Sequence, residues 1–192
     1  MVSANRLPSR LARSVALAGL CVIALAVTHL SSAMAAAAAG GGAGLGAATI
    51  RSLLSSRELW ATVDACNPSD QPNTIGVRGS MPGDGNARDM MYMSFSVQYY
   101  DLTAKRWTNV GKGAASGWQK VGSARVARQA GRNFRFASRP GKPAIRLRGV
   151  VLFQWRREAT ALAGATRPTT AGHKSLAGSD PRGYSAGTCL MP

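Results

Sequence analysis

The feature that most constrains the fold is a long run of alternating apolar and polar residues at positions 143–157, PAIRLRGVVLFQWRR. Its odd-numbered positions from 145 to 155 are apolar or glycine, and its even-numbered positions carry most of its arginines. Successive side chains of a β-strand point to opposite faces, so this period of two predicts a strand with one buried and one arginine-rich face. At about 3.3 Å per residue such a strand crosses a whole small domain. We therefore expect it to be the central strand of a sheet.

Several other segments show strand patterns, and the strongest is DMMYMSFSVQYYDL at positions 89–102. Residues 129–132 indicate a turn because of Gly131. Residues 158–181, poor in hydrophobic residues, indicate a long loop, with a short strand inside it as the alternative. No long amphipathic helix competes with these strands, so the pattern predicts an all-β antiparallel sandwich of about seven strands, with a closed barrel as the alternative. The shorter strand candidates are 57–66, 74–81, 107–110, 118–128, 133–137 and 183–191.

The N-terminus has the three parts of a secretory signal peptide. Arginines at positions 6, 10 and 13 precede an apolar run at 14–28, and Ala33-Met34-Ala35 supplies the small residues that a signal peptidase requires. We predict a signal peptide over 1–35, an Ala/Gly-rich spacer over 36–56 and a β-sandwich domain over 57–192. The protein would then be secreted or associated with the cell envelope. The alternative is an uncleaved membrane anchor, because the sequence has no charged residue between positions 13 and 51.

The predicted mature chain keeps two cysteines, Cys66 and Cys189, because Cys21 falls inside the signal peptide. Two cysteines in an exported chain suggest one disulfide, which here would join the first and last strand candidates. The alternative is a pair of unlinked buried thiols.

The run from Met90 to Met191 resembles an immunoglobulin-like or fibronectin-type-III-like β-sandwich module of secreted bacterial proteins. The resemblance lies in the segments VQYYD and RWTNV, in RNFRF, in IRLRGVVLFQWR and in a closing strand that contains Cys189. The cysteines lie on the first and last strand candidates, whereas antibody domains link two strands in the middle of the domain. The resemblance implies a scaffold for binding or display, and a fold of this kind does not fix a function.

The sequence offers few groups for catalysis. The predicted mature chain has a single histidine, His173, which we expect to be solvated in a loop, and the GxSxG, HExxH and phosphate-loop motifs do not occur. Asp84 lies in a GDGN segment, where a turn is a simpler interpretation than a calcium loop. We therefore predict a protein that is not an enzyme and needs no cofactor or metal. Its eight acidic residues are scattered, and a hydrolase built from acids that meet in space is the less favoured alternative.

Basic charge is the most unusual property of the chain, which has a formal net charge of +16 and no acid between Asp101 and Glu158. An arginine-rich sheet face attracts polyanions, because guanidinium groups form paired hydrogen bonds with phosphate, sulfate and carboxylate. The expected partners are an anionic cell-wall polymer, an acidic polysaccharide or a protein, with no specific role in nucleic-acid binding, and we expect a monomer. The predicted binding residues are Arg135, Arg146, Arg148 and Arg156.

Two further interpretations remain open at this stage. The aromatic residues Tyr92, Tyr100 and Trp107 form either a carbohydrate platform or ordinary packing between sheets and loops. The basic charge is either functional or a compositional bias of the chain, in which case the domain is a purely structural, displayed module.

Overall fold

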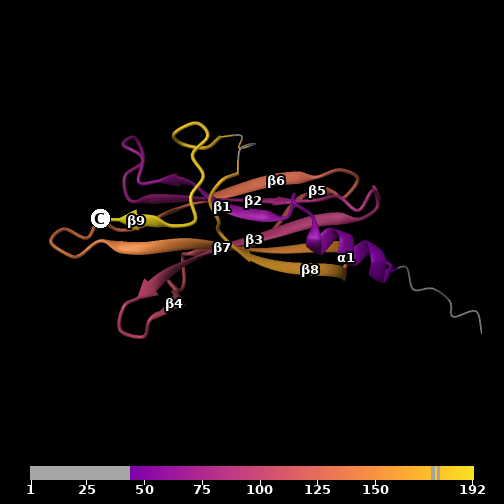
Figure 1. Ribbon diagram of the computed structural model, residues 1–192, viewed down its shortest axis with the longest axis horizontal. Coiled ribbons are helices and arrows are strands. Elements are labelled where there is room, and N and C mark those ends of the chain that lie inside the picture. Colours follow the sequence, from indigo (N-terminus) through magenta and orange to yellow (C-terminus); the bar gives the residue numbers. More distant parts are fainter. Residues whose placement is uncertain (1–43, 174–175, 177) are drawn as a thin grey trace, which may run out of the picture. The chain divides into compact units, whose positions relative to one another are not determined.

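A computed structural model describes residues 44–173, 176 and 178–192, and the predicted signal peptide lies outside these residues. The described residues form one short helix and nine strands, and every pairing between these strands is antiparallel (Figure 1). The prediction of an all-β antiparallel fold is confirmed, with nine strands where the sequence predicts about seven. The elements are α1 (Ala47–Ser55), β1 (Trp60–Cys66), β2 (Thr74–Met81), β3 (Met90–Asp101), β4 (Arg106–Asn109), β5 (Ala115–Ser123), β6 (Arg128–Arg135), β7 (Ile145–Arg157), β8 (Thr160–Pro168) and β9 (Cys189–Met191).

The strands form two sheets. Sheet A has three strands in the order β1-β2-β6. Sheet B has six strands in the order β4-β3-β7-β8, with β5 also paired to β3 and β9 also paired to β7. The predicted central strand is β7, which pairs with β3 over residues 147–156 and with β8 and β9 along its other edge.

One hydrophobic core lies between the two sheets. Sheet A contributes Val63 and Val77, and sheet B contributes Phe95 and Phe153, all nearly or fully buried. The two sheets approach each other closely at Gly149, where an added Cβ would lie 2.5 Å from a methyl group of Val77. This glycine on the buried face of β7 therefore sets how closely sheet A can pack, because any side chain there would push the layers apart.

Two segments differ from the prediction for physical reasons. Residues 160–168, predicted to be loop with a short strand as the alternative, form the nine-residue strand β8, because β7 offers a long strand edge and backbone pairing needs few large side chains. Residues 129–132, predicted as a turn, lie inside β6. Gly131 there provides space, since its Cβ position lies 3.4 Å from the guanidinium of Arg78.

The free edge of β1 is covered by the C-terminal segment. Val63 exchanges two backbone hydrogen bonds with Ala186, at 2.8 and 3.0 Å, and the backbone N–H of Thr170 donates to the carbonyl of Ala61. Paired edges of this kind protect a sheet from joining another chain.

The predicted disulfide is confirmed. It joins Cys66 at the end of β1 to Cys189 at the start of β9, with a Cα–Cα distance of 5.4 Å. Because β9 pairs with β7 in sheet B, the bond also ties the two sheets together.

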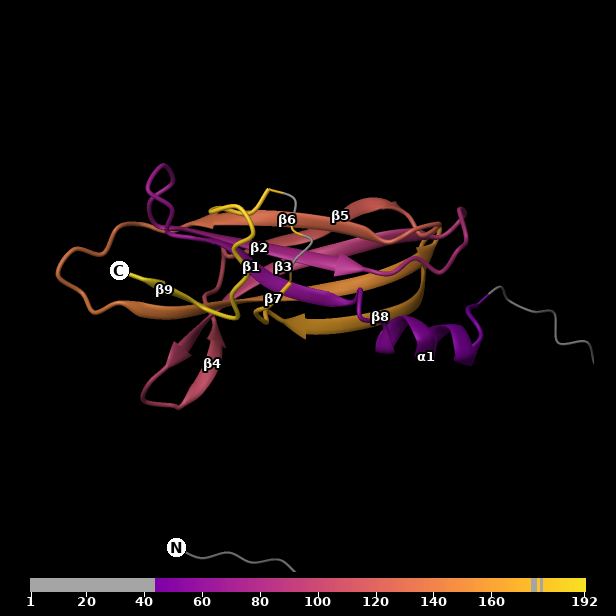
Figure 2. The same cartoon turned by 45° about the horizontal axis from the view of Figure 1, so that its top comes forward.

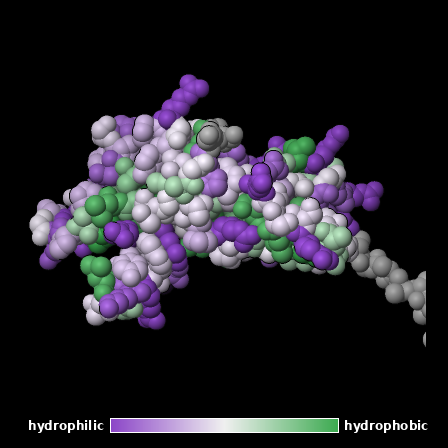
Figure 3. Space-filling view, in the orientation of Figure 1, coloured by the Kyte–Doolittle hydropathy of each residue, from purple (hydrophilic) through white to green (hydrophobic). Residues whose placement is uncertain are grey.

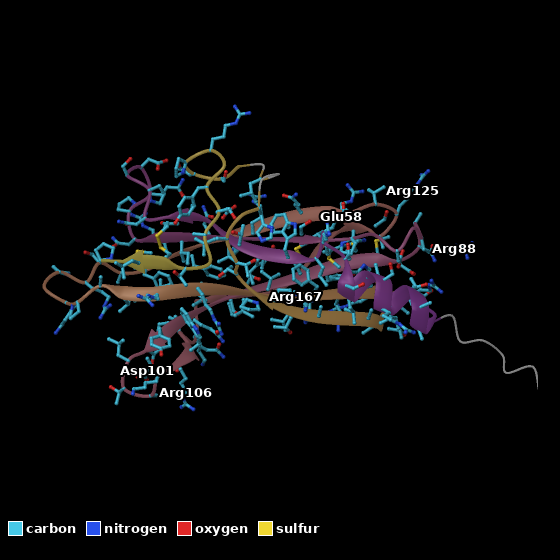
Figure 4. The ribbon with its side chains drawn as sticks, viewed as in Figure 1. Glu58, Arg88, Asp101, Arg106, Arg125 and Arg167 are labelled. Carbon is cyan, nitrogen blue, oxygen red and sulfur yellow. A yellow bond between two sulfur atoms is a disulfide. The ribbon has the colours of Figure 1, made fainter. Side chains whose placement is uncertain are left out.

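Helix α1 lies in the second half of the predicted spacer and packs on the domain. Its Leu53 is buried in the core, and Nη2 of Arg167 on β8 donates a 2.9 Å hydrogen bond to the carbonyl of Leu54 (Figure 4). Ordered structure in the described chain therefore begins before the first strand.

The β3–β4 hairpin extends away from the two sheets, on the side of sheet B that faces away from sheet A (Figure 2). Asp101 and Arg106 lie opposite each other across this hairpin, and Figure 4 places both at its projecting end. Arg88 and Arg125 lie at the opposite end of the domain (Figure 4). The hairpin thus bounds one end of the exposed face of sheet B.

Candidate functional site

The side of sheet B that faces solvent is formed by the even-numbered residues of β3 and β7 and by the residues paired with them. Their odd-numbered neighbours, from Met91 to Val97 and from Leu147 to Trp155, are buried against sheet A. We call this solvent side the outer face of sheet B. It carries Arg146, Arg148 and Arg156 of the four predicted binding residues.

Arg148 is held in a cluster that spans three strands. Its guanidinium carbon lies 4.4 Å from the centre of the Trp107 ring, and its Nε donates a 2.9 Å hydrogen bond to Oε1 of Gln98. The Gln98 amide donates in turn to Oδ1 of Asn109 at 2.9 Å, and Tyr100 contacts the Trp107 ring edge-on. Partial burial lowers the pKa of Arg148, which stays charged at physiological pH.

Arg156 is held in the same way eight residues along β7. Its guanidinium carbon lies 4.2 Å from the centre of the Tyr92 ring on β3 and 4.8 Å from that of Trp118 on β5. Its Nε donates to Oε1 of Gln154. Stacking on aromatic rings fixes the plane of a guanidinium group, so both arginines are presented in a defined orientation.

The two clusters lie at a separation set by the strand. Eight residues at about 3.3 Å each place Arg148 and Arg156 roughly 26 Å apart along β7. Ser94 and Leu152 pair between them, and neither arginine has an acidic partner among the described residues. Arg146 is exposed at the end of the row near the β3–β4 hairpin. The outer face of sheet B is therefore an uncompensated basic row.

The structure does not bring the fourth predicted residue, Arg135, to this face. Arg135 is exposed on β6, where it pairs with Thr74 of β2 in sheet A. The sequence shows which residues share a face of one strand, and it does not show which sheet the strand joins. The four arginines therefore do not form one surface on a single sheet.

The outward side of sheet A carries a different kind of site. Asp64 on β1 and Arg78 on β2 form an ion pair of 2.7 Å, with exposed side-chain fractions of 5% and 16%. They line a cavity of about 440 Å³ together with Asn133 of β6 and Asp180. Burial raises the pKa of Asp64, against the opposing effect of hydrogen bonding and charge from Arg78.

A second buried acid lies at the end of β3. Asp89 is fully buried, and Arg157 donates to both of its carboxylate oxygens, at 2.6 and 2.8 Å. Burial acts to raise the pKa of Asp89, but the hydrogen bonds and the charge of Arg157 help to outweigh it, and the net pKa is lowered. The pKa of Asp84 is raised by burial and then by its contact with Asp89. Within the described residues Oδ2 of Asp84 is buried without a hydrogen-bond partner.

The expectation of a solvated His173 is only partly met. Its ring stacks on Trp60 at a centroid distance of 4.3 Å, its Nε2 lies 2.9 Å from the hydroxyl of Thr170, and burial lowers its pKa. Its backbone N–H donates to the hydroxyl of Ser185. These contacts hold the C-terminal segment against β1, so His173 has a structural role there.

Sequence reasoning identified the arginines but missed how they are held. Tyr92, Tyr100 and Trp107 stand beside arginines on the outer face of sheet B, and Trp118, 43% exposed, was not predicted to join them. Pairing an exposed aromatic residue on one strand with an arginine on another requires the register, which the sequence does not contain. The one available signal was the alternation of residues within 89–102, which places Tyr92 and Tyr100 on the face opposite the apolar residues.

The described part of the chain contains no cluster of three or more histidine, cysteine or acidic side chains that could hold a metal ion. None of its helical segments has the length and apolar character needed to cross a bilayer. Compared with models of known protein families and with curated protein sequences, the chain gives no match.

Proposed function

We propose that the protein is an exported, non-catalytic binding module that holds a linear acidic polysaccharide along the outer face of sheet B. The observation that carries the proposal is the pair of stacked arginines, Arg148 and Arg156, held roughly 26 Å apart with no acidic partner among the described residues. Two fixed positive groups at that spacing suit a polymer that carries repeated negative charges, because a single small anion can contact only one of them.

The neighbouring side chains favour a sugar polymer over a nucleic acid. Gln98, Asn109 and Gln154 place amide groups beside the guanidinium groups, and amides can bond to sugar hydroxyls. The rings of Trp107 and Tyr92 each have a guanidinium over one face, which leaves less bare ring for the base stacking that single-stranded nucleic acid requires.

The outer face of sheet B mixes polar and apolar side chains, because Val150 and Leu152 of β7 lie between the two arginines, opposite Ser96 and Ser94 of β3. Figure 3, in the orientation of Figure 1, shows hydrophilic side chains over most of the surface turned to the viewer, which includes parts of both sheets. Among the described residues Leu102 and Leu190 are the most exposed large hydrophobic side chains, and both lie beside Arg146 at one end of the row. A polymer along the row would therefore meet charged and amide groups at the two clusters, and serine hydroxyls beside two apolar side chains between them.

The test compares two double variants that keep the charge of the protein. Arg148→Lys with Arg156→Lys removes the two stacked forks, and Arg125→Lys with Arg135→Lys makes the same change at exposed sites elsewhere. We expect the first pair to weaken binding to a sulfated or carboxylated polysaccharide about tenfold at physiological salt, since lysine cannot form the paired hydrogen bonds. The second pair should bind as the parent protein does.

Equal binding by all three proteins, with the same dependence on salt, would reduce the effect to net charge and refute the proposal. The measurement is titration calorimetry against a fractionated polysaccharide at two salt concentrations, with the unsubstituted protein as reference.

The export and the finer fold assignment are part of the same proposal. A signal peptide cleaved after Ala35 is supported by the sequence pattern, and intact mass of the exported protein tests it. An immunoglobulin-like arrangement is supported by two antiparallel sheets around one core. An experimental structure in which sheets A and B close into one continuous barrel would contradict it.

A further inference from the structure

The cavity on the outward side of sheet A is built around the ion pair of Asp64 and Arg78. A buried ion pair costs desolvation free energy that the mutual attraction of the charges often only balances. The Asp64–Arg78 pair is nevertheless well sheltered, with Asp64 nine-tenths or more buried. An arrangement with this cost suggests a use beyond stability.

Glycines open the space around this pair. An added Cβ at Gly76 would lie 2.5 Å from Oδ1 of Asp64, and added Cβ atoms at Gly131 and Gly178 would lie 3.4 and 3.2 Å from the Arg78 guanidinium. The three glycines come from β2, β6 and the C-terminal segment. The missing side chains leave room for the ion pair itself to lie against the backbone of sheet A, where it forms part of the cavity wall.

The polar groups that face the cavity are not fully used inside the protein. Only Nε of Arg78 is engaged by Asp64, and within the described residues its Nη groups have no acceptor. The carboxylate of Asp180 likewise has no donor there, although the backbone N–H of Asp180 donates to the carbonyl of Asp64. The Asn133 amide makes one long hydrogen bond, 3.3 Å, to Gln71. The cavity thus offers donors and acceptors side by side.

The charges that line the cavity cancel. Asp64 and Asp180 contribute two formal negative charges, and Arg78 and Arg132 contribute two positive charges. An anion would meet two carboxylates and a cation would meet two guanidinium groups, while an apolar molecule would leave the polar groups without water or partners. A neutral molecule with adjacent hydroxyl groups satisfies all of them, because each hydroxyl both donates and accepts.

We propose that this cavity binds a neutral sugar unit, through hydroxyl groups that donate to Asp64 and Asp180 and accept from Arg78 and Asn133. The cavity volume of about 440 Å³ lies in the range of small-molecule sites, roughly 300–1,000 Å³. The site is on the other sheet from the proposed polymer row and does not depend on it. The two sites would allow the protein to hold a charged chain on one sheet and a neutral sugar on the other.

The experiment is saturation-transfer NMR on the full chain with four free neutral sugars, glucose, galactose, mannose and N-acetylglucosamine, and with glucuronate as the charged comparison. We expect at least one neutral sugar to receive saturation from the protein, more strongly than glucuronate does. Asn133→Trp, on edge strand β6, should fill the cavity and reduce the signal at least fivefold. Arg135→Trp, on the same face of β6 outside the cavity, should leave the signal unchanged.

A second, smaller substitution keeps the proposal testable if Asn133→Trp fails to fold. Asp180→Asn keeps the shape of the side chain and the backbone hydrogen bond but removes one acceptor charge, and we expect it to raise the dissociation constant about fivefold. Absence of a signal from all four neutral sugars, a stronger signal from glucuronate, or full signal in both variants would overturn the proposal. Failure of these tests would leave the polymer site on sheet B untouched, because that site is probed by different variants and a different ligand.

Discussion

Reduction of the Cys66–Cys189 disulfide should produce the largest single change in stability that this fold predicts. The two cysteines lie 123 positions apart and join β1 to β9, so the bond closes most of the domain into one loop. A cross-link stabilises chiefly by restricting the unfolded chain, and in the chain-entropy model a loop of this length is worth about 5 kcal/mol at 25 °C. Small domains have unfolding free energies of about 5–15 kcal/mol, so this loss is a large share of the total.

The assay is urea denaturation of the oxidised and the reduced protein, followed by tryptophan fluorescence. Reduction leaves every side chain in place, so the comparison isolates the cross-link from packing changes that a cysteine substitution would add. We expect the midpoint to fall by several molar in urea with a slope typical of a domain of this size, about 1–3 kcal/mol per molar. A double Cys66→Ser, Cys189→Ser variant should match the reduced protein closely.

A loss below 1 kcal/mol would refute the reasoning, because it would mean that the reduced unfolded chain keeps its ends together. Hydrogen exchange at β9 shows whether the disulfide also acts in the native state. β9 pairs with β7 through three residues only, and its Cys189 and Met191 side chains are buried. If the amides of β9 lose protection in the reduced native protein, the bond holds a native element in place as well as constraining the unfolded state.

Three further predictions concern buried groups, and each is measured by thermal or urea unfolding. Asp84→Asn should stabilise the protein by about 1 kcal/mol at pH 7, because the amide can donate to Asp89. The gain should grow as the pH rises from about 4 and level off above the raised folded pKa of Asp84, because the stability from that carboxyl is present below its unfolded pKa and is lost as the pH rises through its folded pKa. Arg157→Met should cost about 3–5 kcal/mol at pH 7 by leaving a buried carboxylate without its counter-ion, and the cost should shrink below about pH 4, because a lowered pKa gives stability that is lost as the pH falls. Gly149→Ala should cost about 1–3 kcal/mol, because its new methyl group would lie 2.5 Å from a valine methyl of β2, whereas Gly164→Ala, with no contact closer than 3.5 Å, should cost less. A stabilising Gly149→Ala, or an Arg157→Met cost independent of pH, would contradict these mechanisms.

The sequence predicts those parts of the fold in which apolar and polar residues alternate along a single strand. The strands at 143–157 and 89–102 each bury every second residue, and the structure has them as β7 and β3, paired over ten residues. The disulfide was also predictable, because only two cysteines remain after the predicted leader and both lie on strand candidates.

The parts that the sequence does not predict depend on partners distant in the chain. β8 has few large hydrophobic residues and is a strand because β7 provides an edge for its backbone. Gly131 resembles a turn residue in isolation, but it lies in β6 to make room for Arg78, a residue of another strand. The sheet to which Arg135 belongs, and the acid that meets Arg78, are likewise set by topology, which local patterns do not contain.

The same distinction explains why the net charge of +16 is a poor guide to function by itself. The structure divides the arginines by environment: Arg78 and Arg157 are paired with buried acids, and Arg148 and Arg156 lie on aromatic rings with no acid beside them in the described chain. Paired arginines are already neutralised, and freely exposed ones must lose side-chain entropy to bind a polymer. The stacked arginines have neither handicap, because the rings have already fixed their orientation without cancelling their charge. Replacement of these two arginines, rather than a change in net charge, is therefore the test that separates a functional basic face from a compositional one.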